Sequence, residues 1–331
     1  MRKHPLPAFA PCTILAALIL LAFCLEFPAY AQNGFISFDV PTARNTMPKA
    51  VSETGWIGGN WSDAGGVTHG FLRKRNGQYV TIDQPGSSFT EVLDVNASGA
   101  AVGESPGFLR NAHGNVRNIT IPGIESTIAR SINDSGQVVG SAISNLTGHG
   151  FLWDFSGTSI LIDVPGATQV TTANAINAAG EITGFFSDDS ATHGYIREPD
   201  GTLIIFDAAP GTTSMTQPMA INNLGQVTGA FYDDLGVLAG FFRDTDGTIN
   251  LFKSDGSTGN VGLAINDSGV IVGYANVGPG SAAFQRDADG TLEYVQIPFS
   301  NGGSVATGIT NGGHVVGNYV GTDHRLHGWA N

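Results

Sequence analysis

The residues best suited to chemistry in this sequence are carboxylates in two short turns. Asp244 and Asp246 stand two positions apart before a glycine, and Asp287 and Asp289 repeat that pattern. Oxygen ligands at alternate positions are typical of the start of a calcium-binding loop, but such a loop needs further acidic ligands and ends in Glu. Here an alternating, strand-like segment follows at once, which favours hairpin turns. Calcium stays as the weaker interpretation of these four aspartates, and we expect no other cofactor.

Histidines and arginines recur at fixed places in successive segments. Four histidines precede a Gly-aromatic pair, namely His69, His149, His193 and His327. Five arginines follow the aromatic residue by two positions, namely Arg73, Arg110, Arg197, Arg243 and Arg286. Residues that recur once per repeat unit are held apart by the fold, so a shared metal or carboxylate site is disfavoured. We expect each His to bond the backbone of a neighbouring unit and each Arg to pair with a strand Asp such as Asp83 or Asp207.

Charged residues that do not recur are the remaining candidates for a site. They are Lys49, Glu53, Glu91, Glu125 and Arg130, and they lie in or near comparable loops of different units. The sequence contains no G-x-S-x-G, H-E-x-x-H or Gly-rich phosphate loop. Its two cysteines are Cys12 and Cys24, both in the N-terminal segment. We therefore predict no catalytic residue and lean against an enzyme.

Two glycines four positions apart recur seven times along the chain. The first glycines are Gly55, Gly99, Gly136, Gly180, Gly225, Gly269 and Gly313, mostly 44 residues apart. In the five central units an asparagine stands three positions earlier, at Asn96, Asn133, Asn177, Asn222 and Asn266. A polar residue at the first position and Gly at the fourth are typical of a type I turn, and the flanking apolar alternation makes the segment a β-hairpin.

Each unit contains a second hairpin, built around Gly-aromatic pairs such as Gly150-Phe151 and x-Gly turns such as Ser156-Gly157. Four short strands in a unit of roughly 44 residues are typical of a propeller blade. Near the N-terminus, Asn33 to Pro41 resemble the x-Gly turn and second strand of this hairpin without the strand that precedes them, and the last residues, His327 to Asn331, resemble a Gly-aromatic strand with nothing after it. The sequence therefore predicts an all-β, seven-bladed propeller whose N- and C-terminal strands pair and close the ring.

The repeat unit resembles the HAF repeat of bacterial extracellular proteins. It begins as H-G-F-x-R, continues as I-D-x-P-G and ends as A-I-N-x-x-G-x-I-V-G, and the resemblance covers Gly34 to Trp329. It implies export and a repeat architecture but no particular reaction. The chain departs from the pattern at Thr120, Lys253 and Gln296, where Asp is expected, and at Pro106 and Ala239, where His is expected.

The N-terminus is organised like a secretory signal peptide. A basic start is followed by an apolar stretch and then by Ala29-Tyr30-Ala31, which predicts cleavage after Ala31 and a mature domain over residues 32–331. The apolar stretch is too short to span a bilayer. Export would remove both cysteines, so the mature chain holds no disulfide. We expect a monomer located outside the cell or in the periplasm.

The charge composition of the chain disfavours some classes of binding partner. Charged residues make up 13% of the chain and the net charge is −13, which disfavours nucleic acid and anionic membranes as partners. The leading hypothesis is a non-catalytic binding or scaffold module for a glycan, a cell-wall polymer or a protein. The alternatives are an extracellular polysaccharide lyase or hydrolase, favoured by a perturbed carboxylate pair in one cleft, and a purely structural envelope or biofilm protein.

Overall fold

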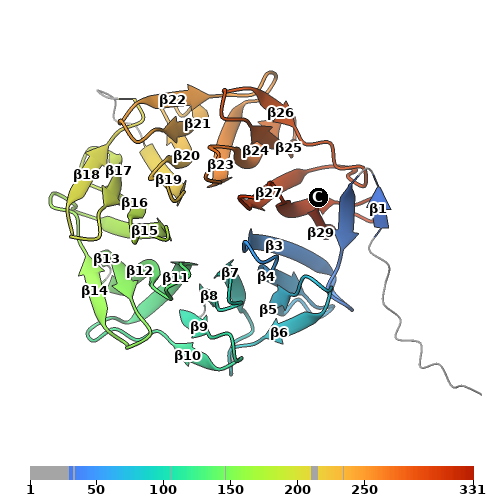
Figure 1. Ribbon diagram of the computed structural model, residues 1–331, viewed down its shortest axis with the longest axis horizontal. Helices are drawn as coiled ribbons and strands as arrows, with labels where there is room; N and C mark the ends of the chain where they lie inside the picture. The colour runs from blue at the N-terminus through green and yellow to red at the C-terminus, as the bar shows by residue number, and fades with distance from the viewer. Residues whose placement is uncertain (1–29, 33, 105, 146, 210–214, 234) are drawn as a thin grey trace, which may run out of the picture.

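The computed structural model describes residues 30–32, 34–104, 106–145, 147–209, 215–233 and 235–331. Within these residues the chain forms 29 strands and no helix. The strands gather into groups of four, or of five in one case, set around a common axis (Figure 1), with one strand of each group innermost. The predicted all-β propeller architecture is confirmed.

We number these groups as blades in chain order. Blade 1 comprises β3 (Asn45–Val51), β4 (Ile57–Ser62), β5 (Thr68–Arg73) and β6 (Tyr79–Ile82). Blade 2 comprises β7 (Glu91–Val95), β8 (Ala101–Glu104), β9 (Phe108–Arg110) and β10 (Val116–Asn118). Blade 3 comprises β11 (Ser126–Ile132), β12 (Val138–Ser144), β13 (Thr147–Trp153) and β14 (Ser159–Ile162).

The remaining described strands complete the ring. Blade 4 comprises β15 (Val170–Ile176), β16 (Ile182–Ser187), β17 (Thr192–Arg197) and β18 (Leu203–Phe206). Blade 5 comprises β19 (Met215–Ile221), β20 (Val227–Tyr232), β21 (Leu238–Arg243) and β22 (Ile249–Phe252). Blade 6 comprises β23 (Gly259–Ile265), β24 (Ile271–Val277), β25 (Gly280–Arg286) and β26 (Leu292–Tyr294). Blade 7 comprises β27 (Ser304–Ile309), β28 (Val315–Val320), β29 (Leu326–Ala330), β2 (Phe35–Phe38) and β1 (Tyr30–Gln32). Single parallel residue pairs join the groups β11–β14, β15–β18 and β19–β22 into one continuous sheet.

Blade 7 joins the two ends of the chain. Strand β2 pairs antiparallel with β29, with Ile36 opposite Ala330 and Phe38 opposite Gly328. The predicted pairing of N- and C-terminal strands is therefore confirmed. Strand β1 adds a fifth, outermost strand by pairing with β2. The rest of the predicted signal peptide, residues 1–29, lies outside the described residues.

Each of the two repeated positions requires glycine for a local physical reason, which blade 2 illustrates. Gly99 has φ +79, the left-handed conformation that closes the β7–β8 turn and that residues with a side chain rarely adopt. Gly103 instead lies against the inner strand, where a Cβ would come 1.8 Å from the carbonyl oxygen of Glu91. The first glycine thus makes the turn, and the second allows the inner hairpin to close.

A β-bulge follows each of these close approaches. Gly103 pairs with Val92, and the register then shifts so that Leu93 has no partner on β8. The same shift occurs in the inner strand of every described blade. A bulge re-aims one side chain without interrupting the sheet.

The core lies between the blades. The seven aromatic rings that follow the repeated glycine, or Ala283 in its place, are fully buried, as the sequence predicts: Phe71, Phe108, Phe151, Tyr195, Phe241, Phe284 and Trp329. A buried polar residue near the start of each inner strand is a repeat feature that the sequence analysis missed. In blade 1, Thr46 Oγ1 accepts a hydrogen bond from the backbone N–H of Val40 at 3.1 Å. Among the described residues, no helix is long and apolar enough to cross a membrane.

Removing one of these rings should cost much of the stability. Phe151→Ala is expected to lower the free energy of unfolding by about 3–5 kcal/mol, because the ring is fully buried and leaves a cavity. Urea unfolding of the two proteins measures the difference. A loss below about 1 kcal/mol would contradict the assignment of Phe151 to the core.

Candidate functional site in the central channel

The repeated asparagines gather around one mouth of the ring. The turns between the first and second strands of the blades surround a shallow cavity of about 190 Å³. Its walls include the five asparagines of the central units and the residues that follow them. The mouth is therefore built from repeating, polar turn residues.

Each of these asparagines makes two kinds of hydrogen bond. Asn96 Oδ1 accepts from the backbone N–H of Ala100 at 3.0 Å, which caps its own turn. Its Nδ2 donates to the carbonyl oxygen of Asn133 in the next blade at 3.1 Å. The cross-blade bond repeats at 2.9–3.2 Å from Asn133, Asn177, Asn222 and Asn266. The type I turn predicted from the sequence accounts for the bond within the turn, but not for the bond to the next blade.

A second ring of hydrogen bonds involves the residue after each asparagine. The backbone N–H of Asn223 donates to Asp267 Oδ1 at 2.8 Å, and that of Asp267 donates to Asn311 Oδ1 at 2.8 Å. The backbone N–H of Asn311 then donates to Glu53 Oε1 at 2.9 Å. Glu53 is thus one link of the mouth ring. Because these polar groups bind one another, the mouth has the character of a structural clasp.

The inner strands, which surround the axis of the ring (Figure 1), carry largely different residues at their bulges. The bulge residues of the inner strands are Lys49, Leu93, Arg130, Asn174, Met219, Leu263 and Thr307. All seven are partly buried, and the inner strands surround the axis of the ring (Figure 1). We call these residues the bulge ring. Two of them reach along the wall to the next blade: Asn174 Nδ2 donates to the Pro218 carbonyl at 2.7 Å, and Thr307 Oγ1 donates to the Pro48 carbonyl at 3.1 Å.

The bulge ring carries charge in one sector only. Lys49 Nζ of blade 1 lies 3.9 Å from Glu91 Oε2 of blade 2, whose side chain is only 15% exposed. Glu104 is the cross-strand partner of Glu91. Arg130 of blade 3 donates from Nε to Ser141 Oγ at 3.0 Å. We call Lys49, Glu91, Glu104 and Arg130 the charged sector.

Burial and the neighbouring charges shift the pKa values of two residues of the charged sector, Glu91 and Arg130. Burial raises the pKa of Glu91, Lys49 opposes that shift, and the charge of Glu104 adds to it. Burial lowers the pKa of the Arg130 guanidinium, and the charge of Glu104 partly offsets this. Guanidinium groups nevertheless stay protonated in proteins. The sector therefore presents two basic side chains and two carboxyl groups, and burial favours the protonated form of Glu91.

Sequence reasoning located part of this sector. Of the five non-repeating charged residues, the structure brings Lys49, Glu91 and Arg130 together. It places Glu53 in the mouth ring, and Glu125 Oε1 accepts a hydrogen bond from the backbone of Asn145 in a loop of blade 3. Glu104 was missed, although it directly follows the repeated Gly103, where other units carry different residues.

Asp94 is a second missed residue. It accepts hydrogen bonds from Ser131 Oγ and from the Ile132 backbone, both at 2.9 Å, and so joins blade 2 to blade 3 beside the charged sector. Burial raises the pKa of Asp94 to about 6, although these hydrogen bonds hold it down.

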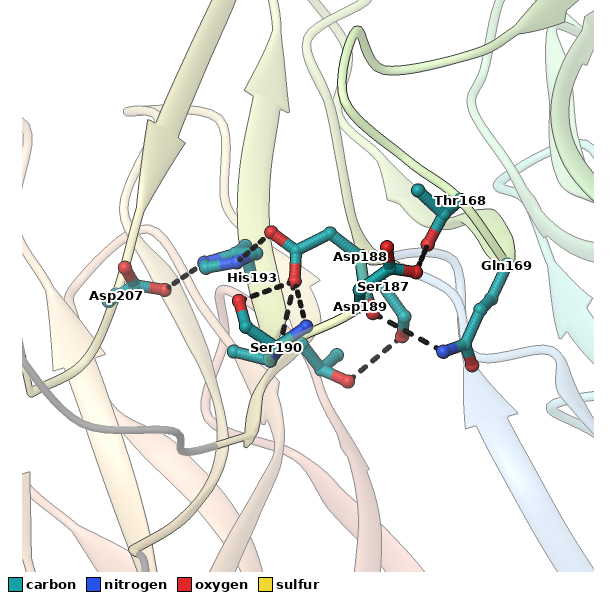
Figure 2. Close-up of polar contacts among 10 residues, drawn as sticks. Thr168, Gln169, Ser187, Asp188, Asp189, Ser190, His193 and Asp207 are labelled. Atoms are coloured by element: carbon teal, nitrogen blue, oxygen red, sulfur yellow. Dashed lines mark hydrogen bonds and ion pairs between the residues drawn. The ribbon is translucent and has the colours of Figure 1, made fainter.

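The recurring histidines pair with carboxylates of their own blade, which corrects the expected bond to a neighbouring backbone. Figure 2 shows the arrangement in blade 4, where His193 lies between two aspartates. His193 Nδ1 is 2.7 Å from Asp207 Oδ1, and Nε2 is 3.2 Å from Asp188 Oδ2. Asp188 also accepts hydrogen bonds from Ser190 and the Ala191 backbone. Because His69, His149 and His327 make matching bonds to Asp83, Asp163 and Asp39, this is a repeated loop clamp.

Three of the five recurring arginines, Arg73, Arg243 and Arg286, lie over aromatic rings, and Arg110 and Arg197 donate to the carbonyls of Asn111 and Glu198; none of the five forms the expected ion pair with a strand aspartate among the described residues. Arg73 Cζ lies 4.8 Å from the centre of the Phe38 ring, and Arg243 Cζ lies 5.1 Å from that of Phe206. Asp83 and Asp207 are bound by histidines instead. Arg73, Arg243 and Arg286 thus join adjacent blades by cation–π contact.

The Asp-rich turns have their carboxylates occupied. Asp246 Oδ1 accepts from the Thr248 backbone and Asp289 Oδ1 accepts from the Thr291 backbone, both at 2.8 Å. Asp244 and Asp287 bind the side chains of Gln226 and Gln285. Across the described residues, no group of three or more His, Cys, Asp or Glu could hold a metal ion.

Solved structures with the same fold extend over nearly the whole chain. A streptogramin B lyase is 14% identical with a TM-score of 0.60, and the alignment covers 90% of this chain and 97% of the lyase. Virginiamycin B lyase from Staphylococcus aureus is 10% identical with a TM-score of 0.61, over 90% and 98% of the two chains. A puromycin hydrolase is 13% identical with a TM-score of 0.59, over 88% and 55%. No protein-family model and no curated protein matches the chain. At these identities the comparison shows the propeller fold alone.

The mouth clasp can be tested at Asn96. Asn96→Ala should lower the free energy of unfolding by about 1–3 kcal/mol, because it removes one hydrogen bond from a buried backbone group in each of two blades. Asn96→Ser is the matched control, since Ser52 caps the equivalent turn of blade 1 through its hydroxyl. Denaturant unfolding should rank the serine variant between the wild type and the alanine variant. Equal stability of all three proteins would show that the cross-blade bond contributes nothing.

The loop clamp should make stability depend on pH. Burial opposes protonation of His193, but its bonds to Asp207 and Asp188 outweigh burial and raise the pKa of the imidazole. A raised pKa in the folded state stabilises the protein fully below the ordinary pKa of histidine, and this contribution is lost as the pH rises through the folded value. The stability difference between wild type and His193→Gln should therefore be larger at pH 5.5 than at pH 8.5. Denaturant titrations at both pH values measure it, with His113→Gln in an exposed turn as the control; a pH-independent difference would refute the charged clamp.

Proposed function

We propose that this protein is an exported, non-catalytic binding propeller of the HAF-repeat kind that holds its ligand at the bulge ring. The observation that carries the proposal is the contrast between two sets of positions. Glycines, asparagines, aromatics and His–Asp pairs repeat from blade to blade and hold the fold. The bulge positions share one backbone geometry but carry seven largely different side chains, and a site that discriminates among ligands needs such variation.

The chemistry of the ring favours a protein partner over a glycan. The charged sector offers Lys49 and Arg130 as cations beside carboxylates, and blades 5 and 6 contribute the aliphatic Met219 and Leu263. A peptide segment carries acidic, basic and apolar groups that match such a wall. A neutral glycan has no charge to offer the cations, and its usual aromatic platform does not occur among the bulge residues.

A second candidate is an enzyme acting on polysaccharides, a lyase or a hydrolase. The observation in its favour is the pair Glu91 and Glu104, cross-strand partners in which burial and charge raise the pKa of Glu91. Two carboxyl groups with different proton affinities are the usual acid and base of glycoside cleavage. Export to the cell exterior or periplasm, proposed from the basic and apolar N-terminal segment, suits either candidate.

Binding assays on the purified protein separate the candidates. We would probe a peptide library and a polysaccharide array, each with calcium and with a chelator. Arg130→Gln should weaken peptide binding by about tenfold or more, equivalent to ~1.4 kcal/mol. Arg75→Ala, at an exposed turn outside the channel, should leave it unchanged.

Four results would overturn the proposal or its details. Shortened polysaccharide products that vanish in Glu91→Gln would make the protein an enzyme. Binding that is indifferent to Arg130→Gln would exclude the charged sector. Loss of binding in the presence of the chelator would support calcium binding at the turns that contain Asp244 and Asp287. An absence of binding to any peptide or polymer would favour the purely structural role.

A further inference from the structure

The outer rim of the ring presents a row of edge strands. Each blade ends in an outermost strand whose far side faces away from the axis (Figure 1). Among the described strand pairs, β14 pairs only with β13 and β18 only with β17. An edge strand with free backbone N–H and C=O groups is a template for pairing with another chain, and proteins usually block it.

Four of the seven rims are polar or carry no exposed apolar residue. In blade 7 the residues of β2 are half-buried or buried, and Gln32, the one residue of β1 that follows the predicted cleavage site, pairs with Phe35. The central outward residues of the outer strands in blades 2 and 6 are charged, Arg117 and Glu293. In blade 1 the exposed position of the outer strand is Thr81. Charged or covered edges resist added strands.

Three consecutive rims lack such protection. Ile160 and Leu161 of β14 are 47% and 39% exposed, and Ile204 and Ile205 of β18 are 37% and 49% exposed. Leu251 of β22 is 46% exposed. Blades 3, 4 and 5 therefore carry exposed, β-branched or aliphatic side chains on edges with free backbone groups.

Carboxylates stand at both ends of the two most apolar edges. Asp154 precedes β14 and Asp163 follows it, while Asp200 precedes β18 and Asp207 follows it. Asp163 is 60% exposed even though it binds His149. A carboxylate therefore flanks each end of both apolar edges, and Asp163 and Asp207 are also bonded to His149 and His193. The complement of such an edge is a segment that is apolar in the centre and basic at its ends.

The chain itself supplies a precedent for strand addition at the rim. Strand β1 pairs antiparallel with β2 over three residues, with Ala31 opposite Ile36. Tyr30 and Ala31 precede the predicted cleavage site, so it is the uncleaved chain in which the outer edge of a blade accepts a further strand without disturbing the four inside it.

We propose that the rims of blades 3 and 4 bind an extended segment of a partner protein, apolar at its centre and basic at its ends, which pairs as an added strand with β14 or β18. Main-chain hydrogen bonds would supply affinity, and the exposed isoleucines and leucine would supply specificity for apolar side chains. This surface is separate from the bulge ring, so the proposal does not depend on the proposed channel ligand.

A synthetic peptide tests the proposal. The probe alternates isoleucine and threonine between paired lysines and is followed by fluorescence anisotropy against the whole protein. Leu161→Lys with Ile205→Lys places on these edges the kind of charge found at Arg117, and should weaken binding by about tenfold or more. Thr81→Lys, the same change on the rim of blade 1, should leave binding intact, as should Arg130→Gln in the channel.

Three further measurements would overturn the proposal. Equal binding of a probe with a central proline would show that no strand pairing occurs, because proline removes a ladder donor. Equal binding of a probe with terminal glutamates would remove the role of the bracketing aspartates. Concentration-dependent dimers in sedimentation that the double variant abolishes would make a second copy of this chain the occupant. Thermal unfolding of the double variant confirms that a loss of binding is not a loss of fold.

Discussion

The architecture depends on one close approach, repeated in every blade. The innermost hairpin can close only where the second strand has no side chain, since a Cβ at Gly103 would come within 1.8 Å of the carbonyl oxygen of Glu91. Directly after this glycine's partner the inner strand bulges. Glycine and bulge are therefore two halves of one device. It brings the backbone close to its neighbour and then turns a single side chain out of the regular pattern.

This device separates stability from specificity. The residues that hold blades together, such as Asn96 across the mouth and Arg243 over Phe206, have neighbours that also repeat. The bulge residue has no cross-strand partner, so its type is constrained by little except the space beside it. Lys49 and Arg130 can occupy positions where other blades carry Leu93 or Met219 while the fold stays the same.

Most of the fold could be read from the sequence because its signals recur at a fixed period. Turn glycines and buried rings recur in all seven units, and missing strands at the two ends of the chain announced the closure. Partners across space could not be read in this way. The period predicted a structural role for His193 and Arg243, but their partners, Asp207 and Phe206, depend on how the hairpins stack. Glu104 and the bulge ring were not predicted because their residue types differ from unit to unit, so the repeat pattern gives no signal at these positions.

The closure at blade 7 has a consequence for how the molecule forms. Ile36 and Ala330 pair although almost the entire polypeptide separates them. Joining them carries the entropic cost of closing a very long loop, and the contacts that offset this cost form only once the intervening blades are in place. Six blades consist of strands that follow one another and can assemble locally. The seventh must wait for the final strand. A chain interrupted before Leu326 would leave β2 without its β29 partner. In the full-length chain, the time needed to complete the ring would be set by the pairing of these two strands.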